Sequence, residues 1–264
     1  MSGSSAGLGW FLRFDPRGLL VPVALMIGLE ALVQFTGFTS SSIASPSQVA
    51  LAFLAVLKDG SLFSATWQTL GAAAGGVAIG GLIGLTLGLL FGLFPLVHAM
   101  LDFTTELVRP IPSIALLPVA LLVFGFGYTM EISLVAKSAI WPVLFVTHAA
   151  ITGIDSRLLE VASLLGMKNI EKVYKIILPS VVPAFFVGVR LAVGVSILVS
   201  IAVEITANPR GLGYAMMRAE ETQRPDLMFA YLLWIGCVGW SVNAALVLTH
   251  ERLFSRFGTK AEVS

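Results

Sequence analysis

The sequence predicts an all-α integral membrane protein with six transmembrane helices. Of its 264 residues, 57% are hydrophobic and only 12% are charged, and the mean hydropathy is +0.92. A soluble globule of this length needs more polar residues to cover its surface. Six apolar stretches approach the roughly 20 residues that one helix needs to cross the hydrocarbon core. They lie at about residues 18–37, 66–92, 108–126, 131–152, 179–205 and 227–249.

Charge and cysteine content exclude several classes of protein. The net charge is +1 and no dense basic stripe occurs, which argues against nucleic acid as a partner. Cys237 is the only cysteine, so an intrachain disulfide and a cysteine zinc cluster are excluded. His98, His148 and His250 lie far apart near predicted span ends, and we interpret them as interfacial residues rather than a metal site. The N-terminus lacks the pattern of a signal peptide and is expected to stay on the chain.

The placement of lysine and arginine predicts the orientation of the spans. With the N-terminus inside, ten of these residues lie in cytoplasmic segments and four in external ones. The ten are Arg13, Arg17, Arg109, Arg157, Lys168, Lys172, Lys175, Arg252, Arg256 and Lys260, and the four are Lys58, Arg210, Arg218 and Arg224. We therefore expect a multi-pass protein with cytoplasmic tails at 1–17 and 251–264 and a transmembrane domain at 18–250, whose loop at 153–178 is cytoplasmic.

The first span carries one acidic residue, Glu30, and is followed by a polar external stretch. Because a charge inside a bilayer is costly, we interpret Glu30 as pairing across helices or facing a partner subunit. In the external stretch at 39–64, Ser45 is placed to cap a helix that has Pro46 at its first position. The sequence therefore predicts a short helix between the first two spans.

The second span carries a glycine at every fourth position, at Gly76, Gly80, Gly84, Gly88 and Gly92. Glycines at this spacing form one bare stripe along a helix, which lets a neighbouring backbone approach closely. We interpret the stripe as an internal packing face. It does not match a phosphate-binding loop, since no Gly-Lys-Ser/Thr follows it and the run lies in the membrane.

The third span starts with two prolines, Pro110 and Pro112, followed by Ser113, and it ends with Gly125 and Gly127. Helix-breaking residues are tolerated in a membrane where neighbouring groups or water satisfy the freed backbone. These five residues are therefore candidates for lining a translocation path.

Three ionisable residues inside the fourth and fifth spans are candidates for a path or a gate. Lys137 either extends its ammonium toward the outer surface or attracts an anion in a vestibule. Arg190 either forms a structural ion pair with a glutamate or lines the path. Glu204, at the end of the fifth span, either forms an outer gate or supports the external loop. That loop, at 208–226, is long enough for a short helix.

The cytoplasmic loop contains an amphipathic segment at 156–175. Its apolar residues recur at helical spacing between charges, at Leu158, Leu159, Ala162, Leu165, Ile170 and Val173. Gly166 costs about 1 kcal/mol in a helix relative to alanine, so it indicates a bend or a close approach between two short helices. Pro179 suits the first turn of the next helix. The loop therefore has an apolar face to offer to a partner.

The same loop carries a spaced motif that reads Glu160-Val161-Ala162, Gly166 and Ile176-Ile177-Leu178-Pro179. It resembles the EAA signature of ABC importer permeases, and Val161 is the one departure, where the signature has alanine. The resemblance implies that this loop is the coupling helix, which binds a groove of a cytoplasmic ATPase subunit. The residues to which it assigns this coupling are Glu160, Ala162, Leu165, Gly166 and Pro179.

Three further segments resemble the nitrate, sulfonate and taurine group of these permeases. They are RPIPSIALLPVALLVFGFG at 109–127, DSRLLE at 155–160 and GLGY at 211–214. Gly71 departs from the group, where a basic residue is common, and so does Val123, where tryptophan is frequent. The resemblance covers about residues 66–250 and implies the type I ABC importer permease fold, with six transmembrane helices and a cytoplasmic coupling helix.

The resemblance implies the permease subunit of a bacterial ABC importer in the inner membrane, surrounded by lipid. Its implied partners are a second permease subunit, most simply a copy of itself, two cytoplasmic ATPase subunits that bind ATP and magnesium, and an extracytoplasmic binding protein that docks on the external loop. The chain itself is expected to bind no cofactor and to have no catalytic residues, because it has neither a phosphate-binding loop nor a catalytic carboxylate pair. The expected substrate is a small anion such as a sulfonate, taurine or nitrate.

Alternatives to this function stay open. A permease of the same fold for a heterocyclic vitamin or its precursor has the same motifs. An ion-coupled secondary transporter uses paired ionisable groups, here Glu30, Lys137, Arg190 and Glu204, and has repeated halves, which this sequence does not show. A membrane scaffold whose loop recruits another protein also fits the residues.

Overall fold

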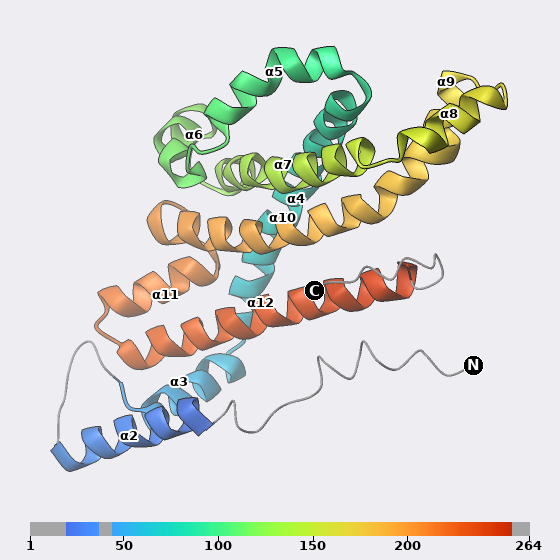
Figure 1. Cartoon of the computed structure of the whole chain (residues 1–264). Coiled ribbons are helices and arrows are strands. Elements are labelled where there is room, and N and C mark those ends of the chain that lie inside the picture. The colour runs from blue at the N-terminus through green and yellow to red at the C-terminus, as the bar shows by residue number, and fades with distance from the viewer. Residues whose placement is uncertain (1–19, 37–43, 255–264) are drawn as a thin grey trace, which may run out of the picture.

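The computed structural model describes residues 20–36 and 44–254, and every regular element within them is a helix. Predictions for the tail at 1–17, for the start of the external stretch at 39–43 and for residues 255–264 of the second tail lie outside the described residues. In chain order the elements are α2 (Leu20–Thr36), α3 (Pro46–Lys58), α4 (Ser61–Leu93), α5 (Pro95–Val108), η2 (Ser113–Leu116), α6 (Leu117–Phe124), α7 (Tyr128–Thr152), α8 (Ser156–Leu164), α9 (Asn169–Lys172), η3 (Val173–Ile177), α10 (Leu178–Thr206), α11 (Gly211–Glu221) and α12 (Pro225–Phe254). Figure 1 shows α7, α10 and α12 lying roughly side by side.

Four of the described helices are long and apolar enough to cross a membrane: α4, α7, α12 and the continuous run from Asn169 to Thr206 that contains α10. A fifth crossing is present if the bent pair of α5 with η2 and α6 counts as one span. Helix α2 has 17 described residues, fewer than the roughly 20 that a span needs. The all-α membrane fold is therefore confirmed, and the count of six spans stays a prediction.

The stretch at 108–126, predicted as the third span with deformable ends, is not one continuous helix. The chain instead forms α5, a turn at 109–112, and then η2 and α6, which are bent by 84° from α5. Pro110 and Pro112 explain the break, because each lacks an N–H and each disfavours a helical backbone in the residue before it. The bend makes α5 and α6 an arch beside α7 (Figure 1).

The glycine stripe of α4 lies against α7 at the centre of the bundle. A Cβ built on Gly80 would lie 2.2 Å from the carbonyl oxygen of Ala136, and one built on Gly84 would lie 2.5 Å from that of Ile140. The other glycines of the stripe, Gly76, Gly88 and Gly92, face Val135, Thr147 and Ile151 at similar range. The bare stripe lets the two backbones touch, which favours association of helices in lipid.

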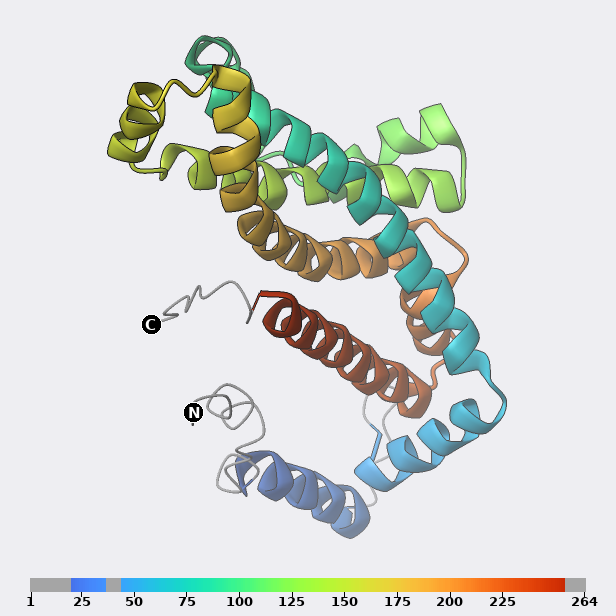
Figure 2. The ribbon, with the colours of Figure 1, turned by 90° about the vertical axis from the view of Figure 1, so that its right-hand side faces the viewer.

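Helix α4 also connects the remaining helices. In Figure 2 it runs as one long diagonal (teal) past α7 and α10 toward α3. Helix α10 packs on both α7 and α4, and α12 contacts α3 and α11. Because α10 joins η3 to α11, the loop with α8 and α9 lies at one end of the bundle and α11 lies at the other (Figure 1).

Two short helices predicted from the sequence are confirmed. Helix α3 starts as expected, with Pro46 in its first turn and the Ser45 hydroxyl accepting a hydrogen bond from the Gln48 N–H at 3.3 Å. The Gln48 side chain accepts in return from the Ser45 N–H at 3.0 Å, which completes a capping box. The loop at 208–226 holds α11, whose first residues are buried against its neighbours.

Candidate functional site

Helix α8 has a defined start and a defined stop. The Asp155 carboxylate caps its N-terminus by accepting from the Arg157 N–H at 2.9 Å. At its C-terminus the N–H groups of Gly166 and Met167 donate to the carbonyls of Ser163 and Ala162, both at 3.0 Å. This paired arrangement is a Schellman motif, which requires a left-handed residue. Gly166 supplies it with a φ of +77°.

Gly166 therefore forms the bend that the sequence predicts, and it is not a point of close approach. Within 20–36 and 44–254, no atom lies within 4 Å of a Cβ built on it. The next turn, α9, starts where the Lys168 N–H donates to Glu171 Oε2 at 2.8 Å. Lys172 then reaches back, and its Nζ donates to the Ser163 hydroxyl at 2.7 Å. This bond holds α8 and α9 together.

The pair α8–α9 continues directly into a long membrane helix. A π-helical turn, η3, joins α9 to α10, and Pro179 lies in the first turn of α10. Residues from Asn169 to Thr206 thus form one continuous helical run. The loop with α8 and α9 is therefore joined to α10 without an intervening irregular segment.

Helix α8 presents an apolar face that nothing in the described chain covers. Leu164 is 87% exposed and Leu165 is 76% exposed, whereas Ala162 is only 3% exposed and faces the chain. The other exposed apolar residues of this loop are Leu158, Val161, Ile170 and Tyr174. Contiguous exposed apolar surface marks an interaction site. Glu160 is exposed beside this face. Sequence periodicity missed Leu164, because it falls outside the repeat formed by Leu158, Leu159, Ala162 and Leu165.

The residues of the predicted path lie together only in part. Pro110 and Pro112 are exposed in the turn between α5 and η2, and the Ser113 hydroxyl lies 2.5 Å from that of Ser138 on α7. Lys137 donates from its ammonium to the carbonyl of Ile111 in the same turn. Gly125 and Gly127 lie elsewhere, where they separate α6 from α7.

Arg190 lies on a different face of the bundle. Its Nε donates to Asn243 Oδ1 of α12 at 3.2 Å, so the bonded partner is an amide and not the predicted glutamate. Arg190 and Asn243 line a pocket of about 620 Å³ between α10 and α12. The structure therefore separates Arg190 from Lys137.

Glu204 lies beneath the N-terminus of α11 and is 1% exposed. Its carboxylate accepts from the Thr69 hydroxyl of α4 at 2.6 Å and from the Gly213 N–H of α11 at 2.8 Å. The Thr69 oxygen in turn accepts from the Leu212 N–H at 2.9 Å. These contacts bind α11 to α4 and α10. Of the two predicted roles of Glu204, they therefore favour support of the external loop over an outer gate.

Glu131 is a buried acid that the sequence reasoning missed. It is 1% exposed on α7, accepts from the Ser200 hydroxyl, and accepts from Asn208 Nδ2 at 2.5 Å. It is the first residue of the predicted fourth span, at 131–152, and was not weighed with the ionisable residues inside the spans. The signal that points to it is that the fourth span begins with a glutamate and the fifth span ends with one, so that both lie at the same end of the bundle. Together the two acids join four helices at this end.

Replacing Glu204 with alanine is expected to loosen α11. The buried Gly213 N–H loses its acceptor, which costs about 1–3 kcal/mol, and the Thr69 hydroxyl keeps only the Ala65 carbonyl. We expect at least about 2 kcal/mol of lost stability and faster proteolysis within 207–224. Thermal unfolding and limited trypsin digestion of the purified protein measure both. Glu221→Ala, at the exposed end of α11, is the matched control, and equal behaviour of the two variants would disprove the role of Glu204.

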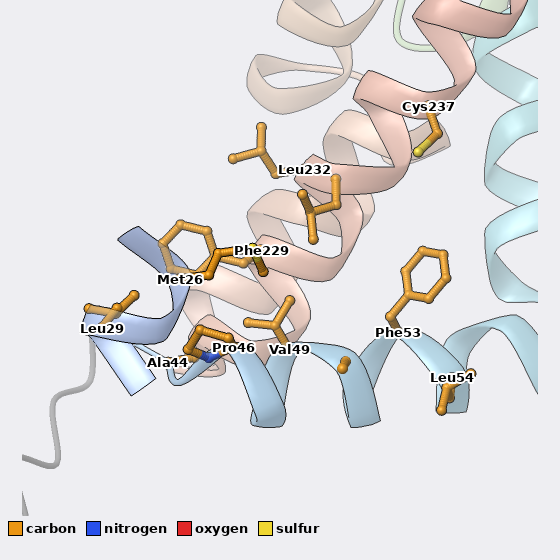
Figure 3. Close-up of a pocket in the computed structure, with 12 residues that line it drawn as sticks. Met26, Leu29, Ala44, Pro46, Val49, Phe53, Leu54, Phe229, Leu232 and Cys237 are labelled. Carbon is orange, nitrogen blue, oxygen red and sulfur yellow. The ribbon is translucent and has the colours of Figure 1, made fainter. Parts of the chain in front are cut away.

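Other polar residues have structural contacts. Glu30 accepts from the Ser47 N–H and hydroxyl at 3.0 and 2.8 Å, which ties α2 to α3. His98 and His148 are distant in sequence, yet their rings stack with centroids 4.6 Å apart. Within the described residues no three potential ligands cluster as a metal site. Cys237 lines an apolar pocket of about 640 Å³ between α2, α3 and α12 (Figure 3).

Comparison with known proteins gives a family match and several related sequences. A model of the family described as "Binding-protein-dependent transport system inner membrane component" matches residues 80–258. The chain is 29% identical to the taurine transport system permease protein TauC of Escherichia coli (strain K12), over 79% of this chain and 78% of that protein. It is also 29% identical to the bicarbonate transport system permease protein CmpB of Synechococcus elongatus, over 87% of each.

A solved structure shows the same fold. A chain of the MetNI methionine ABC transporter, in an inward-facing conformation, superposes with a TM-score of 0.57 at 17% identity. The match covers 70% of this chain and 96% of that one. Because the identity is low, this likeness concerns the fold alone.

Proposed function

This chain belongs to the family of binding-protein-dependent transport system inner membrane components, and we propose that it is the permease subunit of an ATP-driven importer of small anions. The exposed leucine face of α8 carries the proposal. That face lies on a segment bonded to α9 and continuous from there with α10. A partner that binds the face therefore moves a transmembrane helix directly.

The proposed partners occupy the two ends of the bundle. At the end with α8 and α9, two cytoplasmic ATPase subunits bind ATP and magnesium, and each binds the loop of one permease copy. A second copy of this chain completes the membrane part. At the opposite end an extracytoplasmic binding protein docks near α11. Both termini are then cytoplasmic, in a bacterial inner membrane.

The proposed mechanism is a two-state movement. Closure of the ATPase dimer displaces α8 and, through η3, the inner end of α10. The outer end of α10 is bound to α4, α7 and α11 through Glu204 and Glu131, so the displacement reaches the docking side. The loaded binding protein favours the outward-open state from that side, and ATP hydrolysis restores the inward-open state.

The proposed substrate is a small anion such as a sulfonate, taurine, nitrate or bicarbonate. The relatives TauC and CmpB are named for taurine and bicarbonate. Both compounds are small and carry an anionic group of three oxygens around one central atom. Specificity within this class is expected to reside mainly in the binding protein.

Reconstitution tests the proposal. This chain, its ATPase and its binding protein are placed together in proteoliposomes, and uptake of labelled taurine, nitrate and bicarbonate is measured. We expect uptake of at least one anion, dependent on both ATP and the binding protein. Uptake driven by an ion gradient without ATP would contradict the proposal and identify an ion-coupled secondary transporter.

A further inference from the structure

Two cationic side chains and an indole N–H lie along one side of α7, where the turn between α5 and η2 covers it. Lys137 donates to the Ile111 carbonyl of that turn. Trp141 follows one helical turn later, and Phe145 one turn after that, so the three residues share a face. The Arg109 guanidinium, at the end of α5, lies 4.5 Å from the centre of the Phe145 ring. The rings of Trp141 and Phe145 stack along the same line.

This group of donors lacks an acidic partner. The ion pairs found within 20–36 and 44–254 include neither Lys137 nor Arg109. The Trp141 Nε1 atom is buried and has no hydrogen-bond acceptor in that part of the chain. A cation within a bilayer is costly unless it is paired, and a buried N–H without an acceptor costs about 1–3 kcal/mol. An anion beside Lys137 would offer an acceptor to the Trp141 N–H one turn away, and Arg109 adds a positive charge further along the same face, beside Phe145.

The position of Lys137 along α7 also suits contact with an anion that crosses the membrane. Lys137 lies about 14 Å along α7 from Tyr128 at 1.5 Å per residue, near the middle of a hydrocarbon core about 30 Å thick. The backbone beside it is broken at 109–112, and those residues are exposed. Interrupted helices near the midplane provide substrate sites in other transporters. The hydroxyls of Ser113 and Ser138 lie next to the break and bond to each other there.

We propose that Lys137, Trp141 and Arg109 form an anion-binding site within the translocation path, which recognises the oxygen atoms of a sulfonate, nitrate or carboxylate group. The inference rests on the proposed import of anions and names the residues that contact the anion inside the membrane. The ammonium supplies the main attraction, the indole N–H fixes one oxygen, and the guanidinium receives the anion toward the inner end of α7. Arg190, on another face, is not part of this site.

Uptake by the reconstituted complex is the first test. Lys137→Gln keeps a similar size and removes the charge, so nitrate and taurine uptake should fall at least about tenfold, as expected for loss of a charge-assisted hydrogen bond. Lys137→Arg should retain a substantial part of the uptake. Arg252→Gln, an exposed cation at the end of α12, is the control and should import like the wild type. All are compared at equal amounts of assembled complex.

Binding of iodide to the purified complex is the second test, because iodide quenches indole fluorescence by contact. The difference between the wild type and Trp141→Phe isolates the signal of Trp141. We expect iodide to quench this signal and Lys137→Gln to weaken the quenching several-fold, while Arg252→Gln leaves it unchanged. Unchanged quenching in Lys137→Gln would overturn the site.

The two tests separate failure of the site from failure of anion import. If the wild type imports an anion and Lys137→Gln imports it equally well, the site is wrong and the importer stands. If the wild type imports none of the anions, the proposed substrate class is wrong, and the iodide measurement alone decides the site. Quenching that depends on Lys137 would then still support it, and absence of quenching would overturn it.

Discussion

Replacement of Gly80 by valine is expected to separate α4 from α7 and to leave little folded protein in the membrane. A Cβ at this position would lie 2.2 Å from the Ala136 carbonyl oxygen and 2.8 Å from the Ala139 Cβ. The first of these atoms belongs to a helix backbone, which cannot move aside as a flexible side chain can. Overpacking a tight interior typically costs 1–3 kcal/mol and sometimes more. We expect more than about 3 kcal/mol here, because valine adds two further carbons against a backbone.

The neighbouring glycine provides a matched control. No atom of the described residues lies within 4 Å of a Cβ built on Gly81, so Gly81→Val adds the same side chain to the same helix without a collision at its Cβ. Membrane yield and thermal unfolding in detergent compare the two variants directly. Equal yield and equal unfolding temperatures would show that the stripe is not the packing face of α4.

Replacement of Gly166 by valine is expected to abolish uptake while the protein remains in the membrane. The position has a φ of +77°, where a β-branched residue is strongly disfavoured. A left-handed conformation costs roughly 1–2 kcal/mol for a residue with a Cβ. The Schellman motif therefore opens, and α8 changes its direction relative to α9. Because the surroundings of Gly166 are empty, the defect is one of backbone geometry and not of packing.

Asparagine at position 166 distinguishes a defect of backbone geometry from a defect caused by any added side chain. Asparagine tolerates the left-handed region better than valine does, so Gly166→Asn should keep most of the uptake, whereas Gly166→Val should lose more than about tenfold. ATP-dependent uptake in proteoliposomes measures the effect, and the amount of each variant in the membrane fraction is measured in parallel. Uptake by Gly166→Val at the wild-type level would contradict the role of this bend in coupling.

The sequence predicted those features that are set by residues close together along the chain. The four-residue repeat of glycine indicated a packing face, and the structure places Gly80 and Gly84 against α7. Gly166 within an amphipathic segment indicated a bend, and the chain reverses there in a Schellman motif. Both features need a residue without a Cβ, either for close packing of two backbones or for a positive φ. The presence of glycine alone therefore indicates them.

The remaining features depend on contacts between distant residues. Pro110 and Pro112 marked a deformable segment, but residue type alone does not give the 84° angle between α5 and the segment of η2 and α6. Glu131 is recognisable as a structural acid only once Asn208, 77 positions later, lies against it. The Ile111 carbonyl that receives Lys137 is 26 positions away. Helical periodicity carries no information about such pairs, because it describes one element at a time.

Co-purification of an ATPase subunit with this chain tests the central claim most directly. The tagged wild type and the double variant Leu164→Glu with Leu165→Glu are extracted gently from native membranes, and mass spectrometry identifies the proteins retained. Arg252→Glu is the control, since it adds an acid at another exposed position of the chain. We predict an ATPase subunit that the wild type and the control retain and the double variant loses. Equal retention by the double variant, or no ATPase with the wild type in several detergents, would contradict the assignment of α8 as the coupling surface.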